Sequence, residues 1–420
     1  MWRAFSVQSA NHPSRPPKHH TGQRRALIGR LGHRKHRFCS FYLNFAHFPL
    51  SKNVKRPLAE SLPKWYNTDA WFLGCGCRPT CVSKSGGLPR RSREEGFCNY
   101  LMSDLPIERQ IYDLAISCGF DNCGIIPIQD MDGFSEHLQE RIRRIPSSAF
   151  LYDSVGNLSG TKERFPWAKS VIICTCWLGK YRFPASLQGK YAKSFFLSPG
   201  NEMCREFHEN CKRFEAWFAQ RNIRCEGGKQ SGHLSIGPLR YAAMKAGLGI
   251  IRKNNFLYTE KGSFVDLTGY VIDRECVLYH TPDIKPCAEK CSLCQKSCPS
   301  GALKGPYTMS PLECVSFLTT FGKGKLLPGM DDRACGTWIC GCDSCQDACP
   351  HNRRHDWENG IPYPGLEELA PELQPERLLL QSDEFLQKRL MPYTEHHVMP
   401  DEAETLRLCA ERSIRNKGIG

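Results

Sequence analysis

The sequence predicts an α/β (α+β) protein in which a layered α/β domain is followed by a cysteine-rich module and a short helical tail. Three observations lead to this prediction. Strand-like and helical segments alternate over residues 102–285, which is the pattern of helices layered on a sheet. Ten of the 24 cysteines crowd into residues 286–355, and residues 356–420 carry helical signals.

Residues 1–101 differ from the rest of the chain in charge. They hold 18 basic and four acidic residues, so the net charge of +14 arises entirely there and the remainder is neutral. This distribution excludes a basic nucleic-acid-binding surface spread over the whole chain. The segment is predicted to be a basic disordered extension. Two other interpretations stay open, namely an organelle-targeting segment and a true start at Met102.

The α/β domain is predicted to open with a helix that Asp104 caps and Gly119 ends. Apolar residues recur along one face of this helix: Ile107, Ile111, Leu114, Ala115 and Cys118. A short strand over 123–128 follows. A second strand is predicted at 170–178, where a continuous apolar run indicates burial on both faces.

Two further helices and a strand complete the predicted domain. Apolar residues spaced four, three and four apart predict an amphipathic helix over 202–221 that packs on the sheet. Pro238 as a first helical residue and Gly247 as a stop predict a helix over 239–246. Residues 263–273 are predicted to form a strand or hairpin.

The cysteine-rich module has a pattern that disulfides do not require. Its first block is Cys287-x3-Cys291-x2-Cys294-x3-Cys298-Pro, its second is Cys342-x2-Cys345-x3-Cys349-Pro, and Cys314 lies between them. Bacterial ferredoxins bind two [4Fe–4S] clusters with C-x2-C-x2-C-x3-C-P runs, in which the last cysteine crosses to the other cluster. The eight thiols therefore predict two [4Fe–4S] clusters. Such thiols are kept free in a reducing compartment, so a cytoplasmic location is expected.

The crossing rule predicts two ligand sets. One set is Cys287, Cys291, Cys294 and Cys349, and the other is Cys298, Cys314, Cys342 and Cys345. Three residues separate Cys287 from Cys291 where the ferredoxin run has two, so the loop must absorb a one-residue bulge. Two four-cysteine zinc sites are the alternative, but three crowded ligands and two Cys-Pro endings favour iron–sulfur clusters. Cys335 and Cys340 are left over as spare thiols.

The link between the two blocks carries a helix signal. Ser310-Pro-Leu-Glu313 has the spacing of a capping box, which predicts a short helix with Cys314 in its first turn. That helix would connect the two cluster loops, as in a two-cluster ferredoxin-like fold. The module is short of large apolar residues, so metal ligation is expected to supply folding free energy that burial cannot.

A family resemblance comes from the segments around the clusters. Three of them occur in this order around the two cysteine blocks: Lys245-Ala-Gly247-Leu-Gly249-Ile-Ile-Arg-Lys253-Asn254, Gly262-Ser263-Phe264 and Glu313-Cys314-Val-Ser-Phe-Leu-Thr319. This run resembles the epoxyqueuosine reductase family over roughly 102–390, and more distantly the corrinoid reductive dehalogenases. The resemblance implies an oxygen-sensitive oxidoreductase in which two clusters feed electrons to a base-off cobalamin. The cobalamin would deoxygenate an epoxide on a queuosine precursor in tRNA.

The resemblance also implies site residues. The cobalamin or the substrate would be contacted by Arg240, Gly247, Gly249, Lys253, Asn254 and Ser263. Where the family has its proposed acid, an Asp, this chain has His233, whose ordinary pKa of about 6.5 suits a proton donor. Other interpretations stay open: His233 as an ordinary loop histidine, Gly247 and Gly249 as a helix cap and a tight turn, and Lys253 as a surface charge.

The implied partners are an external electron donor and tRNA. Family members often use a helical repeat domain against tRNA, and the expectation from these residues is that the domain is absent or only begun. A competing class is a non-catalytic electron-transfer module whose α/β domain docks a redox partner. No stretch approaches 18 consecutive apolar residues, so no membrane span is expected.

Overall fold

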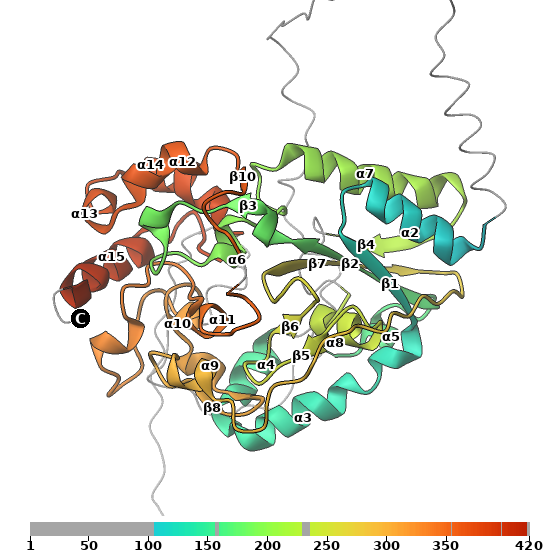
Figure 1. The fold of residues 1–420 in the computed structure, drawn as a ribbon, viewed down its shortest axis with the longest axis horizontal. Helices are drawn as coiled ribbons and strands as arrows, with labels where there is room; N and C mark the ends of the chain where they lie inside the picture. Colours follow the sequence, from blue (N-terminus) through green and yellow to red (C-terminus); the bar gives the residue numbers. More distant parts are fainter. Residues whose placement is uncertain (1–104, 156–158, 229–235, 354, 396, 418–420) are drawn as a thin grey trace, which may run out of the picture. The chain divides into compact units, whose positions relative to one another are not determined.

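A computed structural model of the chain describes residues 105–417, apart from 156–158, 229–235, 354 and 396. Helices and strands alternate in its first part, as predicted (Figure 1). The elements are α2 (Ile107–Ser117), β1 (Asn122–Pro127), α3 (Phe134–Arg144), α4 (Ala149–Val155), α5 (Thr161–Arg164), β2 (Ser170–Trp177), β3 (Tyr181–Arg182), α6 (Lys193–Phe196), α7 (Arg205–Gln220), β4 (Cys225–Gly227), α8 (Leu239–Lys245), β5 (Ile250–Ile251), β6 (Leu257–Tyr258) and β7 (Val265–Ile272).

Short helices dominate the second part, and most of them span a single turn. The elements are α9 (Leu293–Lys296), β8 (Leu303–Gly305), β9 (Thr308–Met309), α10 (Val315–Leu318), α11 (Ser344–Asp347), β10 (Ile361–Pro362), α12 (Leu366–Leu369), α13 (Pro375–Leu378), α14 (Asp383–Phe385) and α15 (Ala403–Lys417). The side chain of Ser382 caps α14 by accepting a hydrogen bond from the Phe385 amide. This agrees with the helical signals predicted for the tail.

The main sheet has four strands in the order β1-β2-β7-β4, and each neighbouring pair is antiparallel. The central strand β2 pairs Cys174 with Cys123 of β1 and with Thr268 of β7. Every residue of β2 except Trp177 is buried, which confirms the predicted burial on both faces.

Helices cover both faces of this sheet (Figure 1). Ile172, Cys174 and Cys176 of β2 pack with α2 and α7 in one apolar core, whereas Val171 and Ile173 pack with α8 in another. The split follows from the two-residue period of a strand, which sends alternate side chains to opposite faces. The predicted layered α/β arrangement is confirmed.

The largest apolar core lies outside the sheet. It joins residues of 178–204 to residues of 363–410, among them Phe196, Leu373 and Leu406, all fully buried. The helical tail therefore does not stand apart: it packs against a segment that follows β2. By contrast, 286–355 has a small core of four buried residues: Val315, Leu318, Cys335 and Trp338.

The capping-box prediction is wrong. Residues Pro311–Glu313 form a 3-10 turn, and Cys314 is extended and precedes α10 instead of lying in its first turn. The Ser310 hydroxyl donates to the Glu313 carboxylate at 3.1 Å, and Lys304 binds the same carboxylate. Because the Glu313 side chain is held by these two partners, it does not reach back to the amide that a capping box would satisfy.

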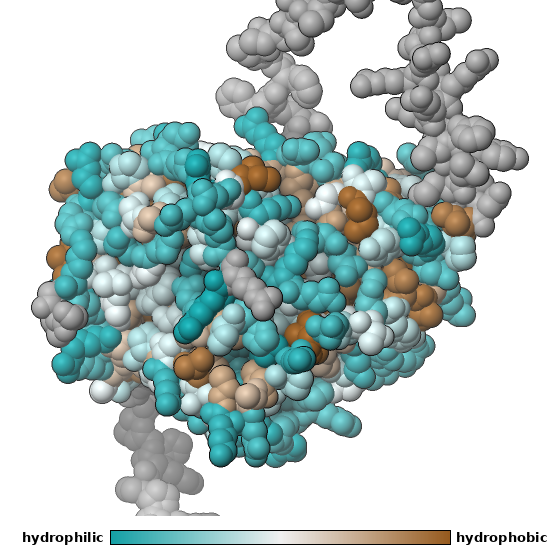
Figure 2. All heavy atoms as spheres, in the orientation of Figure 1, coloured by the Kyte–Doolittle hydropathy of each residue, from teal (hydrophilic) through white to brown (hydrophobic). Residues whose placement is uncertain are grey.

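The described residues show neither a broad hydrophobic surface in Figure 2 nor a long apolar helix. On the face shown in Figure 2, hydrophobic side chains form small separate spots among hydrophilic ones. The longest described helix, α7, has 16 residues. None of the described helices combines the length and the apolar character needed to cross a membrane.

Candidate functional site

Two short helices, α9 and α11, carry the cysteine blocks. Cys294 lies within α9 and Cys345 within α11. The Ser297 hydroxyl lies 3.1 Å from the carbonyl oxygen of Cys294 and 3.1 Å from that of Ser344. A single side chain thus joins the two loops, which places cysteines from both blocks close together.

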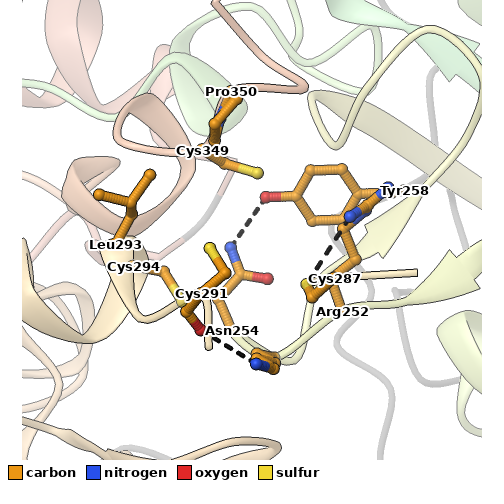
Figure 3. A pocket seen from close by; sticks show the side chains of 10 residues that line it. Arg252, Asn254, Tyr258, Cys287, Cys291, Leu293, Cys294, Cys349 and Pro350 are labelled. Carbon is orange, nitrogen blue, oxygen red and sulfur yellow. Dashed lines mark hydrogen bonds between the residues drawn. The ribbon is translucent and has the colours of Figure 1, made fainter. Parts of the chain in front are cut away.

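The first cysteine set, defined as Cys287, Cys291, Cys294 and Cys349, lines one pocket (Figure 3). The pKa of Cys294 is raised by burial and by the negative charges of Cys287 and Cys291, with a smaller contribution from Cys349. Cys349 comes from the second block, so the pocket unites both loops. This is the grouping that the crossing rule predicted, and cluster ligation by these four thiols stays a proposal.

The second cysteine set, defined as Cys298, Cys314, Cys342 and Cys345, is also gathered in space. Burial raises the pKa of Cys345 well above its ordinary value, and the charges of Cys342, Cys314 and Cys298 raise it further. The thiol of Cys342 donates to the Ser344 hydroxyl at 3.3 Å. The four thiols of the second set are therefore close enough for their charges to act on one another.

Both sets offer sulfur donors alone, which suit iron–sulfur clusters and other thiophilic metals. Among the described residues, no three His, Cys, Asp or Glu side chains converge closely enough to bind a single metal ion. A cubane differs from a single ion because its four thiolates bind at four separate corners. Neither Cys335 nor Cys340 joins a set: both are fully buried in apolar cores.

Arg252 is a site residue that the sequence analysis missed. Its side chain is 2% exposed, and one guanidinium nitrogen donates to the Cys287 thiol at 3.6 Å. Another nitrogen donates to the carbonyl of Lys285, and the group lies 5.1 Å from the centre of the Tyr258 ring. Its position inside the segment that carries the family resemblance was the available signal.

Lys253 is buried at 7% exposure and is not a surface charge. Its ammonium donates to three main-chain carbonyls of the first cysteine loop, at 2.8 Å to Ala288, 2.6 Å to Glu289 and 3.0 Å to Cys291. These bonds span the stretch that contains the extra residue between Cys287 and Cys291. Lys253 therefore holds the predicted bulge in place.

Two more of the predicted cofactor-binding residues contact the second cysteine block. The Asn254 amide donates to the Cys345 carbonyl at 3.2 Å and to the Tyr258 hydroxyl at 2.9 Å. The Ser263 hydroxyl donates to the Gln346 side chain at 2.8 Å and accepts from the Asn352 amide at 2.7 Å. Their contact with cobalamin stays a prediction, and the structure gives both a role in holding α11.

Gly247 and Gly249 are required by the packing of the chain itself. Gly247 has φ +75°, and a Cβ there would lie 1.8 Å from the His280 carbonyl oxygen. A Cβ on Gly249 would lie 2.4 Å from the Tyr258 carbonyl oxygen. These approaches leave no room for a side chain, so the helix-cap and tight-turn interpretation accounts for both glycines without a bound cofactor.

Arg240 and His233 complete the predicted set. The Arg240 side chain reaches solvent, yet the surrounding protein lowers its pKa to about 10, mainly by desolvation and next by the positive charge of Arg141. It donates to the Asn255 carbonyl. His233 lies outside the described residues.

Comparisons with known proteins decide the family. A family model described as a 4Fe-4S double cluster binding domain matches residues 287–352, a range that holds all eight cysteines of the two sets. An epoxyqueuosine reductase of Cellulophaga algicola is 36% identical over 244 residues, which make up 57% of this chain and 77% of that protein. The chain belongs to the epoxyqueuosine reductase family. Its cysteine-rich module is a double [4Fe–4S] cluster binding domain.

Other epoxyqueuosine reductases match over less of their length. The one from Atelocyanobacterium thalassa is 30% identical over 43% of this chain and 59% of that protein. Two further relatives are covered over 42% and 48% of their own length. The chain thus spans about half the length of several relatives that it matches.

Solved epoxyqueuosine reductase structures share the fold. The structure from Streptococcus thermophilus has a TM-score of 0.58 at 23% identity and covers 74% of this chain and 82% of that one. A structure that contains an epoxyqueuosine-modified tRNA stem loop has a TM-score of 0.55 at 24% identity, covering 74% and 81%.

Proposed function

We propose that this chain is an iron–sulfur oxidoreductase that removes the epoxide oxygen from a queuosine precursor. The observation that carries the proposal is the gathering of eight thiols into two sets of four, each completed across the chain, within a member of the epoxyqueuosine reductase family. Converting an epoxide to an alkene and water consumes two electrons and two protons. Two [4Fe–4S] clusters, when bound, supply such electrons one at a time.

The residues of the chain hold and shield the electron-carrying site. Arg252 and Lys253 fix the loop of the first cysteine set, and Asn254 fixes the loop of the second. Tyr258, which is 1% exposed, lines the pocket of the first cysteine set. Because these contacts come from one hairpin, they hold both loops in a constant position relative to the sheet.

We include cobalamin in the proposal on the family resemblance alone. Six residues were predicted to contact it. Three of them already form hydrogen bonds to the cysteine-rich module: Lys253, Asn254 and Ser263. Gly247 and Gly249 are packed against neighbouring main chain. These five do not present free groups to a corrinoid.

Arg240 remains the best candidate for binding a ligand. Its guanidinium reaches solvent, lies near Arg141 and forms no ion pair with a carboxylate among the described residues. Two neighbouring cations of this kind suit an anionic group such as a phosphate. A tRNA substrate fits this arrangement, and a structural neighbour was solved with an epoxyqueuosine-modified tRNA stem loop.

His233 is proposed as the proton donor because it stands where the family has an acidic residue. An external one-electron donor is proposed as the source of electrons. A cytoplasmic location is proposed because every cysteine of the described part of the chain is free, as expected under reducing conditions. The competing interpretation, a module that only transfers electrons, gains no support from the relatives.

The decisive experiment uses the full chain, purified without oxygen and reconstituted with iron and sulfide. We expect about eight irons per chain, a spectral change of added cob(II)alamin, and conversion of an epoxyqueuosine-containing tRNA stem loop to the queuosine form under a chemical reductant. Zinc in place of iron would overturn the cluster assignment. Full iron content with no product from the stem loop would overturn the proposed activity.

A further inference from the structure

Two adjacent cations are buried at the tip of the hairpin formed by β5 and β6. Arg252 is 2% exposed and Lys253 is 7% exposed. Neither forms an ion pair with a carboxylate among the residues that the structure describes; their partners are main-chain carbonyls, one thiol and the Tyr258 ring. A buried charge is costly unless an opposite charge lies close to it. The pair therefore needs an anionic partner.

The group nearest to both cations is the first cysteine set. Arg252 touches the Cys287 thiol at 3.6 Å, and Lys253 bonds to the Cys291 carbonyl at 3.0 Å. Both residues line the same pocket as the four cysteines of this set, and Figure 3 shows Arg252 beside Cys287. A cubane core held by four thiolates carries a net charge of about −2, which becomes about −3 when it takes up one electron. Such a group would be the missing counter-charge.

We propose that Arg252 and Lys253 are the counter-charge of the cluster bound by the first cysteine set and hold its reduction potential above that of the other cluster. Nearby positive charge stabilises the more negative, reduced form more than the oxidised form, which raises the potential. The proposal rests on the two ligand sets proposed above. It makes Arg252 and Lys253 positioning residues that act on electron transfer through the cluster.

The second cysteine set has the opposite surroundings. Lys193 is buried beside it, but its ammonium lies 3.6 Å from the Asp343 carboxylate and 3.0 Å from that of Asp347. The Asp343 side chain, between Cys342 and Cys345 in sequence, is fully buried. The Asp343 carboxylate lies close enough to Cys342 and Cys345 to act on both electrostatically, and a negative charge there disfavours reduction. The chain thus gives the two sets different electrostatic surroundings.

The test is a potentiometric titration of the full reconstituted chain, without oxygen, in which the electron paramagnetic resonance signals of the reduced clusters are followed. Arg252→Met and Lys253→Gln each remove one charge, and the glutamine amide can still donate to the loop carbonyls. Lys212→Gln on α7, an exposed residue paired with Glu209, is the matched control. The titration needs neither substrate nor cobalamin.

We expect each of the two variants to shift one potential to more negative values and to leave the other unchanged, whereas Lys212→Gln shifts neither. Arg252→Lys, which keeps the charge, should shift that potential less than Arg252→Met. Unchanged potentials at full iron content, or equal shifts of both, would overturn the proposal. Loss of iron from Lys253→Gln as well as Arg252→Met would also overturn it, because the two residues would then act only by holding the loop and not by their charge.

The outcomes separate this proposal from the proposed function. A chain that binds two clusters and shows the single shift, but forms no product from the tRNA stem loop, would support the charge pair and remove the activity. A chain that reduces the epoxide, but whose two reduction potentials stay unchanged in the Arg252 and Lys253 variants, would support the activity and remove the charge pair.

Discussion

The side-chain amide of Asn254 donates to the main-chain carbonyl of Cys345 at 3.2 Å. Its neighbour Lys253 bonds to the loop of the other cysteine set, so consecutive residues of one hairpin tip hold both loops. The hairpin follows α8, which packs on the main sheet. The sheet and both cysteine sets are thereby connected over a few residues of chain.

Replacing Cys349 should empty one cluster site and spare the other. Because Cys349 lines the pocket of the first set although its neighbours Cys342 and Cys345 belong to the second, Cys349→Ala should lower the iron content from about eight to about four per chain. Cys335→Ala, at a buried cysteine outside both sets, is the control and should keep about eight irons. Equal iron content in the two variants would show that Cys349 is not a required cluster ligand.

Removing the Ser263 hydroxyl should destabilise the docking of α11. Ser263→Ala removes the donor to the buried side-chain oxygen of Gln346 and one of the two acceptors of the Asn352 amide nitrogen, and an unsatisfied buried group costs about 1–3 kcal/mol. Denaturant unfolding of the oxygen-free protein measures this loss. Ser135→Ala, at an exposed position of α3, should change the unfolding free energy by less than about 0.5 kcal/mol.

Proton donation by His233 can be tested separately from electron supply. His233→Asn should slow epoxide reduction by about a hundredfold to ten-thousandfold, the usual contribution of a general acid, while iron content and cluster potentials stay as in the parent chain. His233→Asp restores the residue type of the family and should retain most of the activity. An asparagine variant as fast as the parent chain would exclude this role.

The free energy of unfolding should depend on pH through His355. Burial lowers the pKa of His355, and the positive charge of Lys193 lowers it further. The unfolded chain takes up a proton near pH 6.5, but the folded chain does so only at lower pH. Stability should therefore fall as the pH drops below about 6.5. In His355→Gln this slope should be smaller, as measured by denaturant unfolding at several pH values.

Removing the clusters should loosen the cysteine-rich module before the sheet. The apolar core of 286–355 is small, whereas the sheet is buried on both faces, so the module depends on metal ligation for stability. After chelation of iron, limited proteolysis should cut within 287–352 first and leave the sheet strands β1, β2 and β7 protected for longer. Simultaneous cleavage of both regions would show that the sheet depends on the clusters as well.

Local patterns in the sequence predicted the local structure well. The apolar spacing placed α2, β2, α7 and α8 within a few residues of their observed bounds. The period of the apolar residues shows which face of a strand or stripe of a helix is buried. The cysteines of each predicted set lie near one another, and their ligation of clusters by the ferredoxin crossing stays a prediction. The antiparallel strand order is set by contacts distant in sequence and was not predicted.

The roles of single polar residues were harder to predict. Lys253 and Ser263 were expected to face a cofactor, but their partners lie on loops that come later in the chain. Arg252 was missed because its position in the segment that carries the family resemblance does not by itself distinguish a buried arginine from an exposed one. Glu313 fits the capping box by spacing, yet the competing cation of Lys304 could only be found from the folded structure.

In the proposed ligand sets, Cys349 of the second block completes the first set, so neither loop alone provides four thiols for a cluster. Iron would then be taken up only after these distant segments of the chain have come together. Maturation of this protein would thereby be coupled to long-range folding, and an intermediate that lacks one cluster would leave thiols of both loops exposed to oxidation.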